Sequence, residues 1–196
     1  MSTRTQAERS ESTRGALLAA GRRLFAERGY TAVGTEEIVR DAGVTRGALY
    51  HHFHGKKELF AAVYEQIEQE VAEQVGAEVG PGTGALETLA AGAELFLDRC
   101  LEPEVQQIAL LDAPAVLGWE QWREIGARYG LGLIAALLTA GMQSGEIRRQ
   151  PVDPLAHALL GALDEVAMLV ARAEDPARAR VEAGETLAGL ISGLGD

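Results

Sequence analysis

An all-helical fold is what this sequence of 196 residues predicts. Apolar residues recur at spacings of three and four, as at Leu17, Ala20, Leu24 and Phe25, which is the period of a helix with one buried side. We find no convincing stretch of the apolar–polar alternation that is typical of strands. About nine helices are therefore expected, at residues 13–28, 57–75, 86–101, 103–111, 119–143, 154–173 and 176–194, with two shorter ones inside residues 34–53.

The helix ends are predicted from particular residues. Gly29 ends the first helix, and Thr35 is expected to cap the second, which carries two glutamates in its first turn. The glycine-rich residues 80–84 predict a flexible break after the fourth helix. Proline suits the first turn of a helix because it has no amide hydrogen to leave unpaired there, and such positions are Pro103, Pro154 and Pro176.

Residues 34–53 predict a helix–turn–helix. Gly43 lies where the chain must leave the first short helix, a position that favours a residue free to take positive φ. Thr45 can cap the second helix, in which Leu49 and Phe53 are four residues apart and share one buried side. Residues 42–57 contain no acidic side chain. One buried side and exposed sides that suit a polyanion are what such a motif needs to enter the major groove of DNA.

Charge is distributed unevenly along the chain. The net charge at pH 7 is −11, but residues 1–60 carry a net charge of +3 and residues 61–196 a net charge of −14. Local rather than total charge sets the field near a surface, so the first part of the chain is expected to turn toward DNA.

Composition also indicates where the protein works. The single cysteine, Cys100, excludes an internal disulfide and fits a reducing compartment. The first ten residues do not form a signal peptide. The longest uncharged run, residues 129–145, is shorter than a membrane-spanning helix. We therefore expect a cytoplasmic protein with no membrane association.

The helix–turn–helix segment resembles that of the TetR family of transcriptional regulators. The resemblance rests on Thr35, Ile38, residues 42–50, His52, Phe53 and residues 56–59, and residues 19–30 are similar to the first helix of the family. It implies a three-helix DNA-binding domain at residues 1–60, with the motif at 34–53, and a larger helical effector-binding and dimerisation domain at 61–196.

The predicted DNA contacts follow from side-chain chemistry and from this resemblance. Arg46 can pair with a guanine edge, and Tyr50 offers a hydroxyl group and an apolar ring. Gly47 and Ala48 keep the helix slim enough for close approach. The resemblance implies phosphate contacts for His52 and Lys56. The complete predicted set is Thr35, Thr45, Arg46, Gly47, Ala48, Tyr50, His51, His52 and Lys56.

Catalysis, metal binding and cofactor binding are not indicated. His51, His52 and His54 point in different directions from one short segment, so they do not converge on a metal. The glycines around residues 130–132 mimic a dinucleotide fingerprint but follow no predicted strand. His157 is interpreted as a core or interface histidine. We predict no enzyme, no catalytic residue, no metal and no cofactor.

Residues 108–129 contain both tryptophans and resemble one type of effector domain of TetR-like regulators. Core packing and a ligand pocket with apolar walls are both open interpretations. A buried Asp112 would need a partner, either Arg123 or a group on the ligand. An amphipathic organic ligand is favoured over a metal or a nucleotide. The candidate ligand contacts are Phe96, Leu110, Asp112, Trp119, Trp122, Arg123, Tyr129, Met142 and Met168.

The last two expected helices have more apolar faces than one core contact requires. The surplus, including Leu187, predicts a homodimer through a four-helix interface, as in TetR-like proteins. The whole sequence thus predicts a repressor that leaves a palindromic operator when it binds a small molecule. Two alternatives are a DNA-binding regulator controlled by a protein partner without any small ligand, and an enzyme with a vestigial DNA-binding part.

Overall fold

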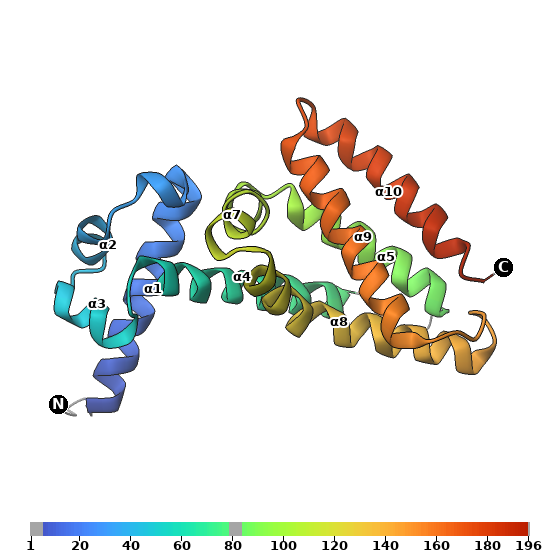
Figure 1. The fold of residues 1–196 in the computed structure, drawn as a ribbon, viewed down its shortest axis with the longest axis horizontal. Helices are drawn as coiled ribbons and strands as arrows, with labels where there is room; N and C mark the ends of the chain where they lie inside the picture. Colours follow the sequence, from blue (N-terminus) through green and yellow to red (C-terminus); the bar gives the residue numbers. More distant parts are fainter. Residues whose placement is uncertain (1–5, 79–83, 196) are drawn as a thin grey trace.

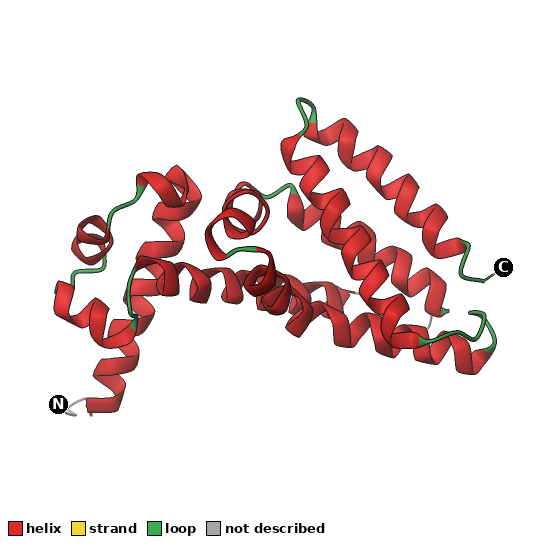
Figure 2. Cartoon of the chain, in the orientation of Figure 1, coloured by secondary structure: helices red, strands yellow, loops and turns green. Residues whose placement is uncertain are grey.

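The structure, a computed structural model, describes residues 6–78 and 84–195, and every regular element in these two ranges is a helix (Figure 2). The predicted all-helical class is confirmed. Because α6, η1 and α7 form one uninterrupted run, the described residues contain the nine predicted helical segments. The elements are α1 (Gln6–Ala32), α2 (Thr35–Asp41), α3 (Arg46–His52), α4 (Lys56–Glu78), α5 (Ala85–Cys100), α6 (Pro103–Val105), the π-helix η1 (Gln106–Asp112), α7 (Ala113–Leu117), α8 (Trp119–Ser144), α9 (Val152–Arg172) and α10 (Pro176–Ser192).

The first two helices start earlier than predicted. α1 begins at Gln6 rather than at residue 13, since the residues before Thr13 are mostly good helix formers. The predicted cap by Thr35 is wrong, because Thr35 is already the first residue of α2. Gly34 occupies the N-cap position in an extended conformation, and its carbonyl oxygen accepts the first hydrogen bond of the helix from Glu37 N at 3.2 Å.

The prolines lie in first turns, as predicted. Pro103 and Pro176 begin α6 and α10, and Pro154 is the third residue of α9. Asp175 caps α10 by accepting a hydrogen bond from the backbone N–H of Arg178 at 3.1 Å. The predicted break at residues 80–84 lies outside the described residues, except for Gly84 at the N-cap of α5.

α1, α2 and α3 pack into a three-helix unit, called here the head, at one end of the molecule (Figure 1). Phe25, Ile38 and Leu49 have no exposed surface and form its centre. Phe60, on α4, joins them, and its ring meets that of Phe25 edge-on at 5.2 Å between centroids. The first turns of α4 therefore belong to the core of the head, and the predicted boundary after residue 60 falls inside one continuous helix.

The remaining elements, α5 to α10, form the body, and α4 runs from the head along it (Figure 1). A second core, centred on Leu97, Leu138, Ile147 and Leu187, joins α5, α8 and α10 to α9. α9 and α10 lie side by side at the end of the body farthest from the head.

Two helices, α8 and α9, are long and apolar enough to cross a membrane by length and composition alone. One or two such helices are weak evidence for a membrane, and their windows include charged residues, so the expectation drawn from uncharged runs is not contradicted. A core helix of a soluble protein passes the same test. Only 28% and 33% of their most apolar windows are buried within this chain, so both helices leave apolar surface for a further contact.

Candidate functional site

The turn of the helix–turn–helix is built from local interactions. Gly43 has φ of 65°, and its N–H donates to the carbonyl oxygen of Arg40 at 3.2 Å. The hydroxyl oxygen of Thr45 accepts from Ala48 N at 3.2 Å, so the predicted cap of α3 is confirmed. Leu49 anchors α3 in the head with no exposed surface. The turn and the anchor together leave the opposite side of α3 free to approach a groove.

That exposed side of α3 carries Arg46, Tyr50 and His51, with Gly47 also exposed. The guanidinium of Arg46 lies over the Tyr50 ring, 5.6 Å from its centroid, and donates to the Glu36 carboxylate at 2.9 Å. Both members of this ion pair are well exposed, so solvent screens it and it is weak.

The other predicted contacts lie around α3. Thr35, Ala48 and His52 are half-buried and Thr45 is exposed. Burial is the main cause that lowers the pKa of His52, and His51 and Arg14 add to it, so His52 needs a nearby phosphate to become charged at neutral pH.

Lys56 is engaged inside the head. Its ammonium donates to the carbonyl oxygens of Tyr30 and Val33 at 2.9 and 2.8 Å, and it lies 3.9 Å from the centroid of the Tyr30 ring. Lys56 therefore holds the segment that joins α1 to α2. Its phosphate contact stays a prediction and would use the one remaining N–H.

The head is tied to the body at the end of α1. Gly29 has φ of 73° and redirects the chain, and the N–H of Tyr30 then donates to the Asp112 carboxylate at 2.7 Å. Of the two partners left open for Asp112, Arg123 is excluded, because Arg123 forms an ion pair with Asp164 instead. Asp112, at the end of η1, thus connects the body directly to the head.

We expect Asp112→Ala to lower the free energy of unfolding by about 1.5–3 kcal/mol, because a charge-assisted hydrogen bond is lost and the Tyr30 N–H loses its acceptor. Urea denaturation measures the change. Asp112→Asn keeps an acceptor oxygen and should lose clearly less. Equal losses in the two variants would contradict the role assigned to this bond.

A cavity of about 110 Å³ lies inside the body, between α4, α5, α8, α9 and α10. It is smaller than typical ligand sites of roughly 300–1,000 Å³. Phe96 and Tyr129, both predicted as ligand contacts, line it. The rest of its wall is mainly apolar and includes Val71, Val75, Leu89, Ala93, Leu133, Ile134, Leu137, Leu159, Leu160, Leu163, Leu187 and Ile191.

The other predicted ligand contacts lie outside this wall. Trp122 is buried in the core, where its indole N–H donates to the carbonyl oxygen of Ala109 at 3.2 Å, whereas the side chain of Trp119 is 66% exposed. Packing in the core therefore accounts for much of residues 108–129. The predicted residues outside the cavity wall are Leu110, Asp112, Trp119, Trp122, Arg123, Met142 and Met168.

Two carboxylates that the sequence analysis did not single out line the cavity, Glu68 from α4 and Asp164 from α9. For both carboxylates, the spacing of the neighbouring apolar residues could have indicated their position. Glu68 follows Tyr64 by four residues and precedes Val71 by three, so it lies on an apolar side of its helix. Asp164 is placed in the same way between Leu160 and Ala167.

Burial disfavours the charged form of both carboxylates. It raises the pKa of Glu68 to about 7, and the charge of Asp164 acts in the same direction. It also raises the pKa of Asp164 to about 6, although Arg123 acts against that change. Two acids whose charge is so disfavoured, facing one cavity, are typical of a functional site.

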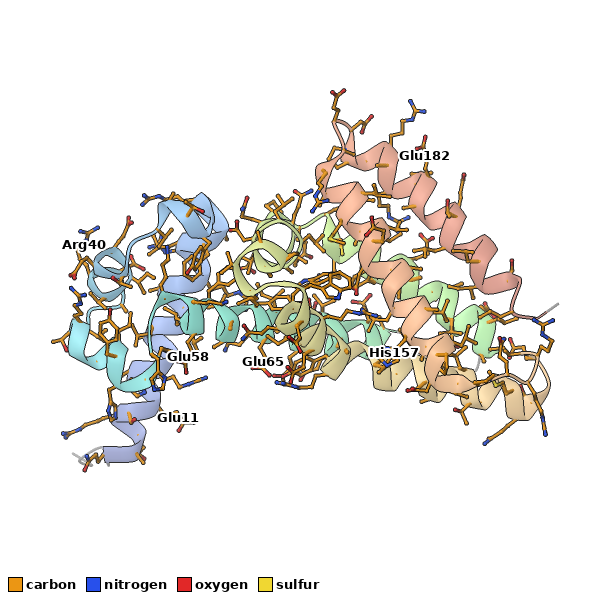
Figure 3. All side chains as sticks on the ribbon, in the orientation of Figure 1. Glu11, Arg40, Glu58, Glu65, His157 and Glu182 are labelled. Carbon is orange, nitrogen blue, oxygen red and sulfur yellow. The ribbon has the colours of Figure 1, made fainter. Side chains whose placement is uncertain are left out.

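His157 lies outside both sites. It is half exposed on α9, 3.9 Å from Asp153, and Figure 3 shows it at the surface. Its assignment to the core of the chain is therefore wrong, and its place in an interface stays a prediction.

Comparison with known proteins covers both parts of the chain. A family described as bacterial regulatory proteins of the tetR family matches residues 17–63, and one described as the tetracyclin repressor-like C-terminal domain matches residues 86–194. The transposon Tn10 TetC protein of Escherichia coli is 31% identical over 165 residues, which cover 83% of this chain and 82% of that protein.

Solved structures of other proteins also resemble this chain. A TetR-family transcriptional regulator from Pectobacterium atrosepticum is 36% identical, with a TM-score of 0.85 and 97% of each chain covered. FadR from Bacillus subtilis, solved in complex with stearoyl-CoA, has a TM-score of 0.72 over 91% of this chain and 97% of its own. At 20% identity, FadR is evidence for the fold alone.

A capped turn, an anchored helix with a basic and aromatic exposed side, and a helical body behind them define a helix–turn–helix regulator of transcription. The chain belongs to the TetR family of transcriptional regulators. Its relatives are DNA-binding regulators and not enzymes, which agrees with the prediction made from the missing catalytic constellation.

Proposed function

We propose that this regulator is a cytoplasmic homodimer that represses transcription from a palindromic operator and leaves it when a small molecule occupies the cavity. The observation that carries the proposal is the exposed side of α3, where Arg46 and Tyr50 stand next to each other on a helix anchored by Leu49. Arginine and tyrosine at this place suit base edges and phosphates in the major groove.

The dimer is supported by the outer surface of α9 and α10. Leu169 on α9 and Val181 and Leu190 on α10 are 61%, 54% and 52% exposed, so both helices carry large apolar residues on their outer surfaces. Leu187, which the sequence suggested for the interface, is 1% exposed and packs inside the chain's own core, so that choice is wrong. Two copies would place two α3 helices at a fixed spacing, which a palindrome matches.

Ligand control is supported by the cavity in the body. Glu68 lines the cavity from α4, the helix whose Phe60 lies in the core of the head. A ligand that prefers one position of α4 would therefore shift the position of the head. The small volume of the cavity favours one rival, a DNA-binding regulator controlled by a protein partner without a small ligand.

Sequence selection from random DNA tests the proposal. A palindrome with half-sites about one helical turn apart should be enriched. Arg46→Ala should then relax the preference at one position of each half-site by about 1–3 kcal/mol, because a bidentate contact to one base is lost. Binding is measured on single-base variants of the enriched site.

Arg40→Ala is the control for this measurement. Arg40 is exposed on α2, and Figure 3 shows it on the outer side of the head. Its loss should change affinity by the same factor on all sequences. A uniform loss for Arg46→Ala would contradict base reading, and failure to enrich any palindrome would contradict the proposed function.

A further inference from the structure

We propose that the cavity of the body binds a small organic ammonium ion, with its charged group at Glu68 and Asp164 and its hydrocarbon part against the apolar wall. This inference deepens the proposed function and rests on it. It goes beyond the presence of an effector by naming the chemical class that the cavity selects.

The charged groups of the cavity wall are both carboxylates, Glu68 from α4 and Asp164 from α9. The other polar side chains that line it are the hydroxyl-bearing Thr88 and Tyr129. The charge of Asp164 acts on Glu68. Gly126 of α8 lies against the same carboxylate, since a Cβ built there would be 3.7 Å from a carboxylate oxygen of Glu68 and 3.5 Å from the hydroxyl oxygen of Tyr64.

The carboxylates at this part of the cavity outnumber the cations near them. Arg123 pairs with Asp164 and donates to the carbonyl oxygen of His157 at 3.2 Å. Within the described residues no ion pair is formed by Glu68, which is hydrogen-bonded to the Tyr64 side chain and lies near the charge of Asp164. One cation therefore faces two partly buried carboxylates. An added cation would offset the free energy that burial costs the second one.

The remaining wall selects an organic cation over a metal ion. Ca²⁺ and Mg²⁺ need about six oxygen ligands, whereas the described residues hold no group of three possible metal ligands. Leu89, Phe96 and Leu133 instead offer hydrocarbon contact on several sides. A dry apolar cavity on the order of 150 Å³ accepts a benzene-sized molecule, so a cavity of about 110 Å³ suits a hydrocarbon part smaller than a six-carbon ring.

Three probes that share one short hydrocarbon chain test the charge preference: n-butylammonium, 1-butanol and butanoate. Calorimetric titration of the full-length protein should show the ammonium ion binding at least about tenfold tighter than the alcohol, because only the cation satisfies the unpaired carboxylate. The carboxylate probe should not bind. Equal affinity for ammonium and alcohol, or no binding of any probe, would overturn the proposal.

Two variants on α4 test whether Glu68 causes the preference for the ammonium ion over the alcohol. Glu68→Gln should remove the preference for the ammonium ion over the alcohol. Glu73→Gln makes the same chemical change at an exposed position one and a half turns away and should keep the preference. If Glu68→Gln does not fold, as judged by circular dichroism, the comparison of the three probes on the wild-type protein still tests whether the cavity prefers an ammonium ion.

The pH dependence of ammonium affinity is a second test of the role of Glu68. Burial and Asp164 raise the pKa of Glu68 to about 7, so the group loses its proton as the pH rises through that value. Ammonium affinity should therefore increase between about pH 6 and 8 in the wild type and increase less in Glu68→Gln, where Asp164, with a pKa of about 6, is the carboxylate that still loses a proton. Tyr64, Cys100 and Arg123 also face this region, but burial keeps the first two neutral over this range and the third stays charged.

DNA binding is measured separately, so the two proposals fail in different ways. Protein that selects a palindrome but does not prefer the ammonium probe leaves the regulator in place and removes this inference. Protein that binds the ammonium ion at Glu68 without any change in operator affinity supports the inference and contradicts ligand-controlled release.

Discussion

Leu169→Glu is expected to turn the dimer into monomers at micromolar concentration. Leu169 lies on α9 with an exposed fraction of 61%, and α9 packs against α10. A carboxylate at this position would be buried without a partner in the dimer, which costs about 3–5 kcal/mol. That cost corresponds to roughly a 100- to 1,000-fold weaker association or more. Light scattering over a dilution series measures it.

The effect on DNA binding should be as large, because a monomer engages one half-site only. Trp119→Glu is the matched control, since Trp119 is equally exposed and apolar but lies on α8. It should leave both assembly and operator affinity unchanged. Leu187→Glu would instead unfold the chain, as Leu187 faces the core. A wild-type protein that is monomeric at micromolar concentration would contradict the dimer.

Arg123→Met is expected to lower the free energy of unfolding by about 3–5 kcal/mol at pH 8. Arg123 and Asp164 are each only 19% exposed, and removing the guanidinium leaves two carboxylates facing the cavity with no cation. The double variant Arg123→Met/Asp164→Leu should recover most of the loss, because it removes the unpaired charge as well. Urea denaturation of the three proteins measures both effects.

The pH dependence of this loss has a definite sign. Burial raises the pKa of Asp164 in the folded protein to about 6, above its usual value, so the charged form is disfavoured by folding. The penalty is present above that pKa and disappears as the pH falls through it. The difference between Arg123→Met and the wild type should therefore shrink from pH 8 to pH 5. A difference that stays constant would contradict the role of Asp164.

Much of the DNA-reading part could be predicted from the sequence because its determinants are local. Gly43 closes a turn, Thr45 caps a helix three residues on, and Leu49 and Phe53 share one side. Each interaction joins residues within four positions of one another, so spacing alone indicates it. The wrong cap at Thr35 is also a local error, of one residue. Gly34, in an extended conformation, occupies the N-cap position that was predicted for Thr35.

The body was harder to predict because its contacts join distant parts of the chain. The sequence left Arg123, eleven residues away, and a group on a ligand as open partners for Asp112, but its partner is the backbone of Tyr30, 82 residues before it. Leu187 belongs to an apolar run in which either side of the helix could have faced a neighbour. Only the packing of α10 against α5 decides which side is inside.

The sequence by itself determined the helical class, the helix–turn–helix and the family, because periodicity, caps and motif spacing are properties of short segments. The tertiary structure alone decided where the charges lie. Glu68 and Asp164 meet at one cavity only because α4 and α9 pack around it, and Arg123 from α8 neutralises one of them. Burial and pairing change the free energy of a carboxylate by several kcal/mol, and neither can be predicted before the helices are packed together.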